Sequence, residues 1–108
     1  SPFNWCDFPA AVLPAGSISG APKSAARRII AENEKLRGPY CGILGWIENR
    51  NGVINGVLSV GIRLFWREND EIFFGTGAGI TWGSDPTAEW EETVLKAQRL
   101  TGIAGGRI

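Results

Sequence analysis

The segment 85–100 constrains the fold more strongly than any other part of the sequence, because a helix start signal is followed there by helical periodicity. Asp85 can accept a hydrogen bond from the free N–H groups of a first turn, and Pro86 suits the first helical position, which needs no N–H donor. Trp90 and Val94 lie four residues apart and share an apolar side. The sequence therefore predicts one amphipathic helix over residues 85–100.

A second side of this helix carries Glu89, Glu92 and Lys96, which fall within about 60° of one another at about 100° per residue. Taken by itself, this side is typical of a solvated surface with a weak Glu–Lys pair. The alternative is a divalent-cation site, because Mg²⁺ takes oxygen ligands from one or two carboxylates together with substrate and water oxygens. The helix alone leaves both interpretations open.

The composition excludes several function classes. The 108 residues contain 11 Lys and Arg against 11 Asp and Glu, so no net basic field exists to hold nucleic acid or an acidic membrane. No apolar run approaches the roughly 20 residues of a membrane span. The sequence has no histidine, which removes a Ser–His–Asp triad and a histidine-ligated zinc site from this segment.

The two cysteines, Cys6 and Cys41, have no metal-site spacing and are too few for a disulfide scaffold. We therefore expect reduced thiols in a cytoplasmic protein. The sequence begins at Ser1 and contains no Met, which favours a processed or excised piece of a longer protein. No linker, repeat or charge run interrupts it, so a single unit is expected.

Residues 14–23, Pro-Ala-Gly-Ser-Ile-Ser-Gly-Ala-Pro-Lys, form a glycine-rich loop that opens into a helical pattern ending near residues 35–38. Pro22 fits the first turn of that helix. Small residues before a helix leave N–H groups free for an anion at the positive end of the dipole. An ordinary strand-to-helix turn is the alternative. A Walker loop is excluded because Gly16 and Gly20 are too close together.

Strands are expected in the middle of the chain, with a hairpin turn at Asn51-Gly52. The predicted strands cover residues 40–48, 53–66, 72–75 and 78–82. In the strand over 53–66, alternation places Ser59, Gly61 and Arg63 on one face. Two small side chains beside an arginine make a shallow basin suited to a carboxylate, although an exposed face with a surface arginine fits equally well.

The stretch 75–79, Gly-Thr-Gly-Ala-Gly, allows a ligand or another backbone to approach closely. It is a poor match to a nucleotide-binding fingerprint, because no helix opens directly after it. A glycine kink in a sheet is the alternative interpretation.

Five motifs, in this order, resemble the C-terminal part of the chorismate-utilising enzymes. They are the stretch 14–23, residues 37–42, Ile62-Arg63, residues 77–80, and residues 89–93 with Lys96. This family includes anthranilate synthases, aminodeoxychorismate synthases, isochorismate synthases and salicylate synthases. The runs 56–66 and 74–86 look most like the aminodeoxychorismate synthases. Anthranilate synthase and a non-catalytic binding module of the same family are the alternatives.

The resemblance implies Mg²⁺ as cofactor, with Glu92 as a ligand and Glu89 as a second carboxylate that binds directly or through water. It implies that Arg63 and Tyr40 hold the enolpyruvyl carboxylate of chorismate, while the metal receives the ring carboxylate. The implied catalytic residues are Lys96 and Glu89. The implied substrate-binding residues are Ser17, Tyr40, Arg63, Gly77, Ala78, Gly79 and Lys96.

The resemblance also implies a fold and a partner. The expected class is α+β, with a helix, antiparallel strands and a C-terminal helix forming part of a large β-sandwich with flanking helices. Ammonia from a glutamine amidotransferase would replace the 4-hydroxyl of chorismate in folate biosynthesis, or add at position 2 and release pyruvate if the product is anthranilate.

The family's catalytic domain is much longer than this chain, so residues 1–108 are expected to be an incomplete domain. A further glutamate and a catalytic lysine would lie upstream. We therefore expect the isolated piece to be inactive, and its uncovered sheet to favour self-association.

Overall fold

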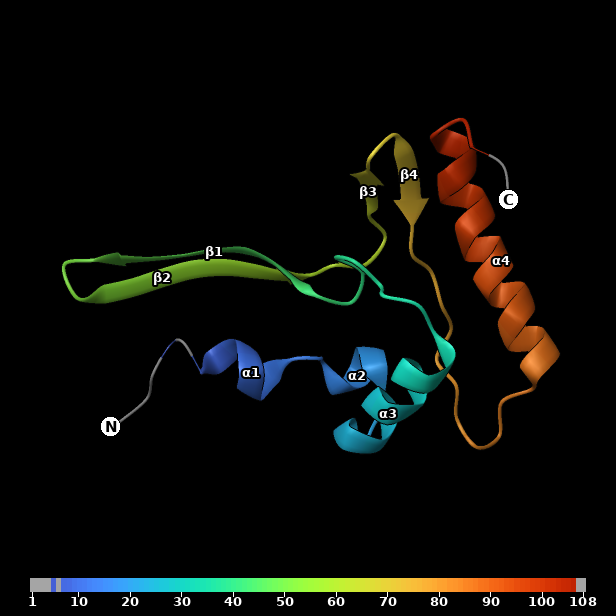
Figure 1. The fold of residues 1–108 in the computed structure, drawn as a ribbon, viewed down its shortest axis with the longest axis horizontal. Helices are drawn as coiled ribbons and strands as arrows, with labels where there is room; N and C mark the ends of the chain where they lie inside the picture. Colours follow the sequence, from blue (N-terminus) through green and yellow to red (C-terminus); the bar gives the residue numbers. More distant parts are fainter. Residues whose placement is uncertain (1–4, 6, 107–108) are drawn as a thin grey trace. The chain divides into compact units, whose positions relative to one another are not determined.

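The computed structural model describes residue 5 and residues 7–106, which divide into two compact units, Ser1–Gly61 and Ile62–Ile108. Each unit combines helix with a two-stranded antiparallel sheet (Figure 1). The predicted α+β class is therefore confirmed, while membership in a larger β-sandwich stays a prediction. Among the described residues, no helix combines the length and the apolar character that crossing a membrane requires.

The first unit opens with three helices: α1 (Phe8–Val12), α2 (Gly16–Ser19) and α3 (Lys23–Asn33). The stretch 14–23, predicted as a glycine-rich loop that opens into a helix, contains the helical turn α2, and α3 follows it as predicted. Small residues in that stretch let the backbone close its own hydrogen bonds. Pro22 precedes α3 as its N-cap, with extended φ and ψ, and does not form part of the first turn.

The long hairpin of this unit pairs β1 (Ile43–Arg50) with β2 (Val53–Val60), as Figure 1 shows. The predicted turn at Asn51-Gly52 is confirmed, and both residues have positive φ, 53° and 84°. Such a two-residue turn matches the twist of the flanking strands. β1 begins later than the predicted residue 40 because residues 38–41 form turns.

Two glycines allow the strands of this hairpin to approach closely. Gly45 pairs with Leu58 and Ile47 pairs with Gly56, so a large apolar residue faces a glycine in each pair. Gly45 has φ +155°, and a Cβ added there would lie 1.9 Å from the carbonyl oxygen of Val57. An alanine at position 45 would therefore require the strands to separate.

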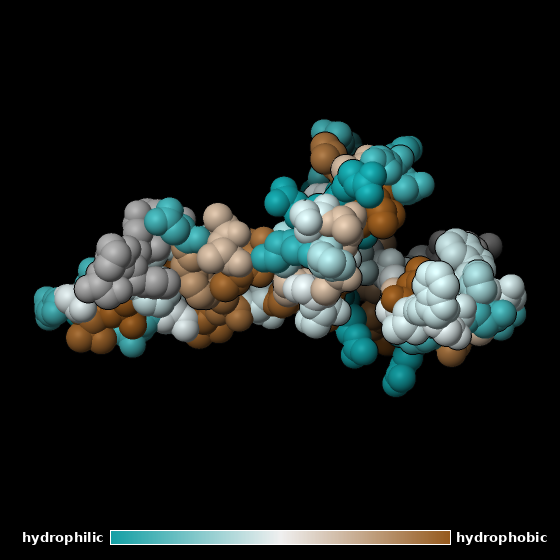
Figure 2. All heavy atoms as spheres, turned by 90° about the horizontal axis from the view of Figure 1, so that it is seen from below, coloured by the Kyte–Doolittle hydropathy of each residue, from teal (hydrophilic) through white to brown (hydrophobic). Residues whose placement is uncertain are grey.

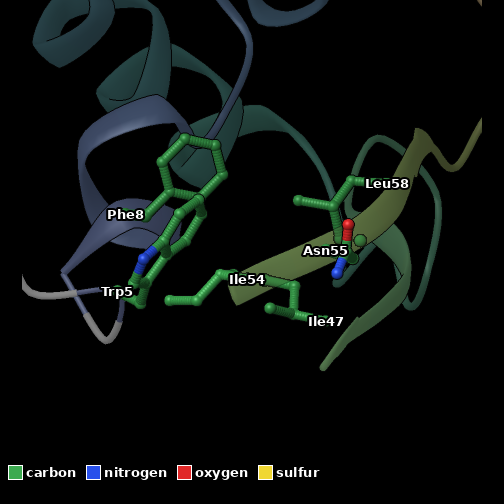
Figure 3. Close-up of a pocket in the computed structure, with 7 residues that line it drawn as sticks. Trp5, Phe8, Ile47, Ile54, Asn55 and Leu58 are labelled. Carbon is green, nitrogen blue, oxygen red and sulfur yellow. The ribbon is translucent and has the colours of Figure 1, made fainter. Parts of the chain in front are cut away.

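One face of the hairpin is partly covered by the N-terminal segment. Figure 3 shows Trp5 and Phe8 facing Ile47, Ile54 and Leu58. These side chains line a hollow with a volume of about 260 Å³. The two rings lie 5.6 Å apart between centroids. Trp5 and Phe8 thus cover apolar side chains of this hairpin. Cys6, which is expected to be a reduced thiol, lies outside the described residues.

The chain does not run as one strand from residue 53 to residue 66. β2 ends at Val60, and β3 (Phe65–Glu68) starts only after a break. Within the break Arg63 has a left-handed φ of 53°, which is incompatible with an extended strand. The predicted face shared by Ser59, Gly61 and Arg63 is therefore wrong, because the alternation that defined it stops at Val60.

In the second unit, β3 pairs with β4 (Glu71–Phe74) through two aromatic cross-strand pairs. The ring centroids of Phe65 and Phe74 are 4.8 Å apart, and those of Trp66 and Phe73 are 5.6 Å apart. Such pairs stabilise a short hairpin beyond its backbone hydrogen bonds. The predicted strand over 78–82 is wrong: in this described part of the chain those residues form no strand.

The C-terminal helix, α4 (Pro86–Ile103), confirms the strongest prediction and continues beyond residue 100. Its start is as expected: Asp85 Oδ1 accepts a 2.8 Å hydrogen bond from the N–H of Ala88, and Pro86 occupies the first turn.

Few hydrophobic side chains are buried. Among the described hydrophobic residues, those that are buried are Cys41 and Ala97, each 8% exposed. Large apolar residues such as Trp46, Val57 and Trp90 are exposed instead, and Figure 2 shows hydrophobic residues at the molecular surface. Each unit thus lacks the core that a self-sufficient domain of this size normally builds.

Candidate functional site

The predicted site residues fall in both units, with Ser17 and Tyr40 in the first and the others in the second. In the second unit, α4 presents Glu89, Glu92 and Lys96 at helical spacing, as predicted. The ammonium of Lys96 pairs with the carboxylate of Glu92, and both side chains are about half exposed. Lys96 also makes a long contact of 3.5 Å with the carbonyl oxygen of Gly77. The helix face and the glycine stretch are therefore brought together by one side chain.

Glu89 and Ala78 meet at a second hollow of about 210 Å³. Its lining consists of Ala78, Ile80, Ser84, Pro86, Glu89, Trp90 and Thr93. The turn that leads into α4 is held by Ser84, whose hydroxyl accepts a 3.0 Å hydrogen bond from the N–H of Thr81. The open backbone predicted for the glycine stretch is thus located beside the first turns of α4.

Arg63 is exposed, in the break that precedes β3. In the described part of the chain, no ion pair engages its guanidinium. Arg67 differs: it contacts Asp70 at 2.5 Å and donates to the carbonyl oxygen of Asn69 at 3.0 Å. The guanidinium of Arg63 is therefore available to bind a ligand, whereas the guanidinium of Arg67 is already hydrogen-bonded within its own turn.

In the first unit, the structure places Tyr40 in a compact cluster that the sequence did not reveal. The guanidinium of Arg37 lies 5.8 Å from the centroid of the Tyr40 ring and makes two 2.6 Å hydrogen bonds to the carboxylate of Glu34. Burial raises the pKa of the Tyr40 hydroxyl, and the Cys41 thiol raises it further. The hydrogen bond from Arg37 lowers the pKa of Glu34.

Arg37 and Glu34 are functional candidates that the prediction missed, because Arg37 was used only as a motif member and helix-end signal. The spacing of Glu34, Arg37 and Tyr40 by three residues was available in the sequence. It indicated nothing until the turn at residues 38–41 was known.

Ser17 is exposed on α2. The N–H groups of Ile18 and Ser19 donate to the carbonyl oxygen of Ala15, at 3.0 and 2.9 Å. These donors are used within the turn, so the anion site expected at this loop loses part of its basis. Lys23 is likewise engaged, donating to the carbonyl oxygens of residues 11 and 13 at 3.1 and 3.3 Å.

Among the described residues, no group of three or more His, Cys, Asp or Glu side chains gathers as a metal site would require. Glu89 and Glu92 nevertheless lie one turn apart on α4, and Glu92 is exposed to solvent. Hard oxygen donors at this spacing fit Mg²⁺ as part of a donor set, since Mg²⁺ commonly uses one or two carboxylates.

Comparison with known proteins adds independent information. A family model described as chorismate binding enzyme matches residues 2–102. Anthranilate synthase component 1 of Neisseria gonorrhoeae is 43% identical over 101 residues, covering 91% of this chain and 20% of that protein. The Aquifex aeolicus protein of that name is 43% identical over 99 residues, covering 91% of this chain and 19% of the relative.

A more distant relative, anthranilate synthase component 1 of Saccharolobus solfataricus, is 36% identical over 106 residues, covering 97% of this chain and 24% of the relative. The chain thus spans about a fifth of the length of the curated relatives it matches. No solved structure shows a significant match to it.

Proposed function

This chain belongs to the family of chorismate-binding enzymes, and from that premise we propose that it forms the C-terminal part of an anthranilate synthase component 1. The observation that carries the proposal is the 36–43% identity to proteins of that name from Neisseria, Aquifex and Saccharolobus. These relatives favour anthranilate synthase over aminodeoxychorismate synthase, which the runs 56–66 and 74–86 resembled most. The expected reaction is amination of chorismate at position 2 followed by release of pyruvate.

The substrate-binding residues of this proposal are those that the family resemblance implies. Arg63 and Tyr40 hold the enolpyruvyl carboxylate, because a guanidinium and a phenol are good donors to an anion. Gly77 and Gly79 offer backbone N–H groups at a place where no side chain obstructs approach. Ala78 lies between these two glycines, and the Ser17 hydroxyl can form a hydrogen bond to the substrate.

Glu92 and Glu89 would hold Mg²⁺, which supplies positive charge for the ring carboxylate of chorismate when it is bound. Lys96 keeps Glu92 and the carbonyl of Gly77 in register, since its ammonium contacts both. Ammonia is supplied by a glutamine amidotransferase subunit or domain. The remaining acid–base groups are contributed by parts of the parent enzyme outside this chain.

A chimaera tests the proposal directly. The matching C-terminal segment of the Neisseria gonorrhoeae enzyme is replaced by this chain, and the same segment is simply deleted in a control. Chorismate, ammonium and Mg²⁺ are supplied, and anthranilate is followed by its fluorescence. We expect anthranilate from the chimaera and none from the deletion control.

A parallel chimaera on an aminodeoxychorismate synthase scaffold separates the two reactions. Activity in that scaffold together with a silent anthranilate synthase chimaera would overturn the assignment in favour of the aminodeoxychorismate reaction. Loss of activity in both scaffolds, with both chimaeras folded, would contradict catalytic function in this chain altogether.

A further inference from the structure

The ion pair between Arg37 and Glu34 differs from the other arginine ion pairs of the described residues. Its two 2.6 Å hydrogen bonds join Nε and one terminal nitrogen of Arg37 to both oxygens of Glu34. The Arg37 side chain is 23% exposed, whereas Arg28, Arg50 and Arg67 are 71%, 76% and 68% exposed in their pairs. A bidentate, partly buried pair of this kind fixes the plane of the guanidinium, which a solvated single contact does not.

That fixed plane lies against Tyr40. The distance from the guanidinium carbon to the ring centroid is 5.8 Å, within the range of a cation–π contact. The backbone closes the same turn, because the N–H of Tyr40 donates to the carbonyl oxygen of Arg37 at 3.1 Å. Arg37 therefore contacts Tyr40 through both side chain and main chain.

The turn is anchored to the end of the long hairpin. The N–H of Cys41 donates to the carbonyl oxygen of Gly61, and the N–H of Gly61 donates to that of Gly42, both at 2.8 Å. Cys41 has a left-handed φ of 66° and is buried. These hydrogen bonds hold the backbone beside Tyr40, so the conformational freedom that remains to Tyr40 is in its side chain. Arg37 contacts that side chain.

We propose that Glu34 and Arg37 form a clamp that sets the position of the Tyr40 phenol, so that Arg37 is a positioning residue for carboxylate binding by Tyr40. The role in substrate binding rests on the proposed function, whereas the clamp itself does not. Because Glu34 neutralises Arg37, the clamp contributes geometry rather than net charge. The electrostatics of the pair are consistent with this clamp, because the hydrogen bond between the two side chains raises the pKa of Arg37 and lowers the pKa of Glu34.

The first experiment uses the complete 108-residue chain, in which Tyr40 is the only tyrosine. Ring-labelled tyrosine then gives NMR signals from Tyr40 alone. Arg37→Lys keeps the charge but loses the planar fork, so the ring signals should move toward those of free tyrosine. Glu34→Gln should move them in the same way, because it releases the guanidinium from its plane.

Arg50→Lys is the matched control, since Arg50 also pairs with a glutamate but is exposed at the hairpin end. It should leave the Tyr40 signals unchanged, and circular dichroism verifies that each variant retains its fold. If the ring signals of Arg37→Lys and Glu34→Gln coincide with those of the original chain, the clamp does not exist.

The second experiment measures chorismate in the active chimaera. Tyr40→Phe and Arg37→Lys should each raise KM, about tenfold for loss of a hydrogen bond to a charged group, with kcat changed by less than about twofold. The double variant should be no worse than Tyr40→Phe, because Arg37 acts through the phenol. Additive effects of the two substitutions would overturn the positioning role. An inactive chimaera would contradict the proposed function, while the NMR result would still decide the clamp.

Discussion

The ammonium nitrogen of Lys96 lies 2.5 Å from Oε1 of Glu92, one helical turn earlier on α4. With the Glu92 side chain 51% exposed and that of Lys96 43% exposed, the pair is worth only about 0.3–0.5 kcal/mol. A divalent cation that binds Glu92 would have to compete with this ammonium group. Because the pair is weak, it orients the carboxylate of Glu92 without preventing that carboxylate from binding a metal ion.

Glu92→Gln in the active chimaera should raise the Mg²⁺ concentration needed for half-maximal activity while the fold stays intact. The amide keeps the shape and one oxygen but loses the charge that a hard cation requires. Glu91→Gln is the control, because Glu91 is an exposed neighbour outside the predicted site. A Mg²⁺ titration of Glu92→Gln that overlays the unmodified chimaera would remove Glu92 from the list of ligands.

Arg63→Ala in the same chimaera should weaken chorismate binding far more than Arg67→Ala. Loss of one partner of a charge pair that substrate binding desolvates costs roughly 2–5 kcal/mol, against about 0–1 kcal/mol for an arginine that stays in water. Arg67 is the appropriate comparison because it is already paired with Asp70. Binding can be measured by isothermal calorimetry; equal affinities for the original protein and Arg63→Ala would show that the carboxylate is held elsewhere.

Gly45→Ala should destabilise the first unit, because the new Cβ would lie 1.9 Å from the carbonyl oxygen of Val57. Overpacking of this kind costs about 1–3 kcal/mol. Gly102→Ala is the opposite case: nothing lies within 4 Å of the added Cβ, and alanine favours helix by about 0.5–1 kcal/mol. In thermal unfolding followed by circular dichroism, Gly45→Ala should have a lower midpoint than the original chain and Gly102→Ala a higher one. An unchanged midpoint for Gly45→Ala would contradict the close strand contact.

The 108-residue chain by itself should neither consume chorismate nor remain monomeric. Amination requires a nucleophile, a base and an acid positioned at the ring, and this chain has no histidine. Exposed apolar residues such as Trp46 and Val57 favour association. The assay is chorismate loss with ammonium and Mg²⁺, with light scattering at several protein concentrations. Turnover comparable to that of a complete relative would overturn the expectation.

Local signals predicted the parts of the fold that local chemistry determines. The cap at Asp85, the length of most of α4 and the Asn51-Gly52 turn all follow from residue preferences within a few positions. The family was likewise recognisable from five short motifs.

Prediction failed where backbone geometry overrides alternation. Apolar residues alternate without a break from Leu58 to Leu64, but Arg63 adopts a left-handed conformation that no periodicity reveals. The clamp on Tyr40 escaped notice for a related reason, because it depends on a turn that brings residues 34 and 40 together. The preference for aminodeoxychorismate synthase rested on the general likeness of the runs 56–66 and 74–86 and on no diagnostic residue, and the relatives favour the alternative, anthranilate synthase.

The left-handed conformation of Arg63 sets two demands on one residue. A backbone with φ near +53° is adopted most readily by glycine or asparagine. Any other side chain at such a position costs on the order of 1 kcal/mol of folding free energy. If Arg63 holds a carboxylate as we propose, the residue that would relax the main chain is one that cannot bind the substrate. Selection for higher stability would therefore favour glycine or asparagine at position 63. The variants stabilised in this way would have the poorest affinity for chorismate.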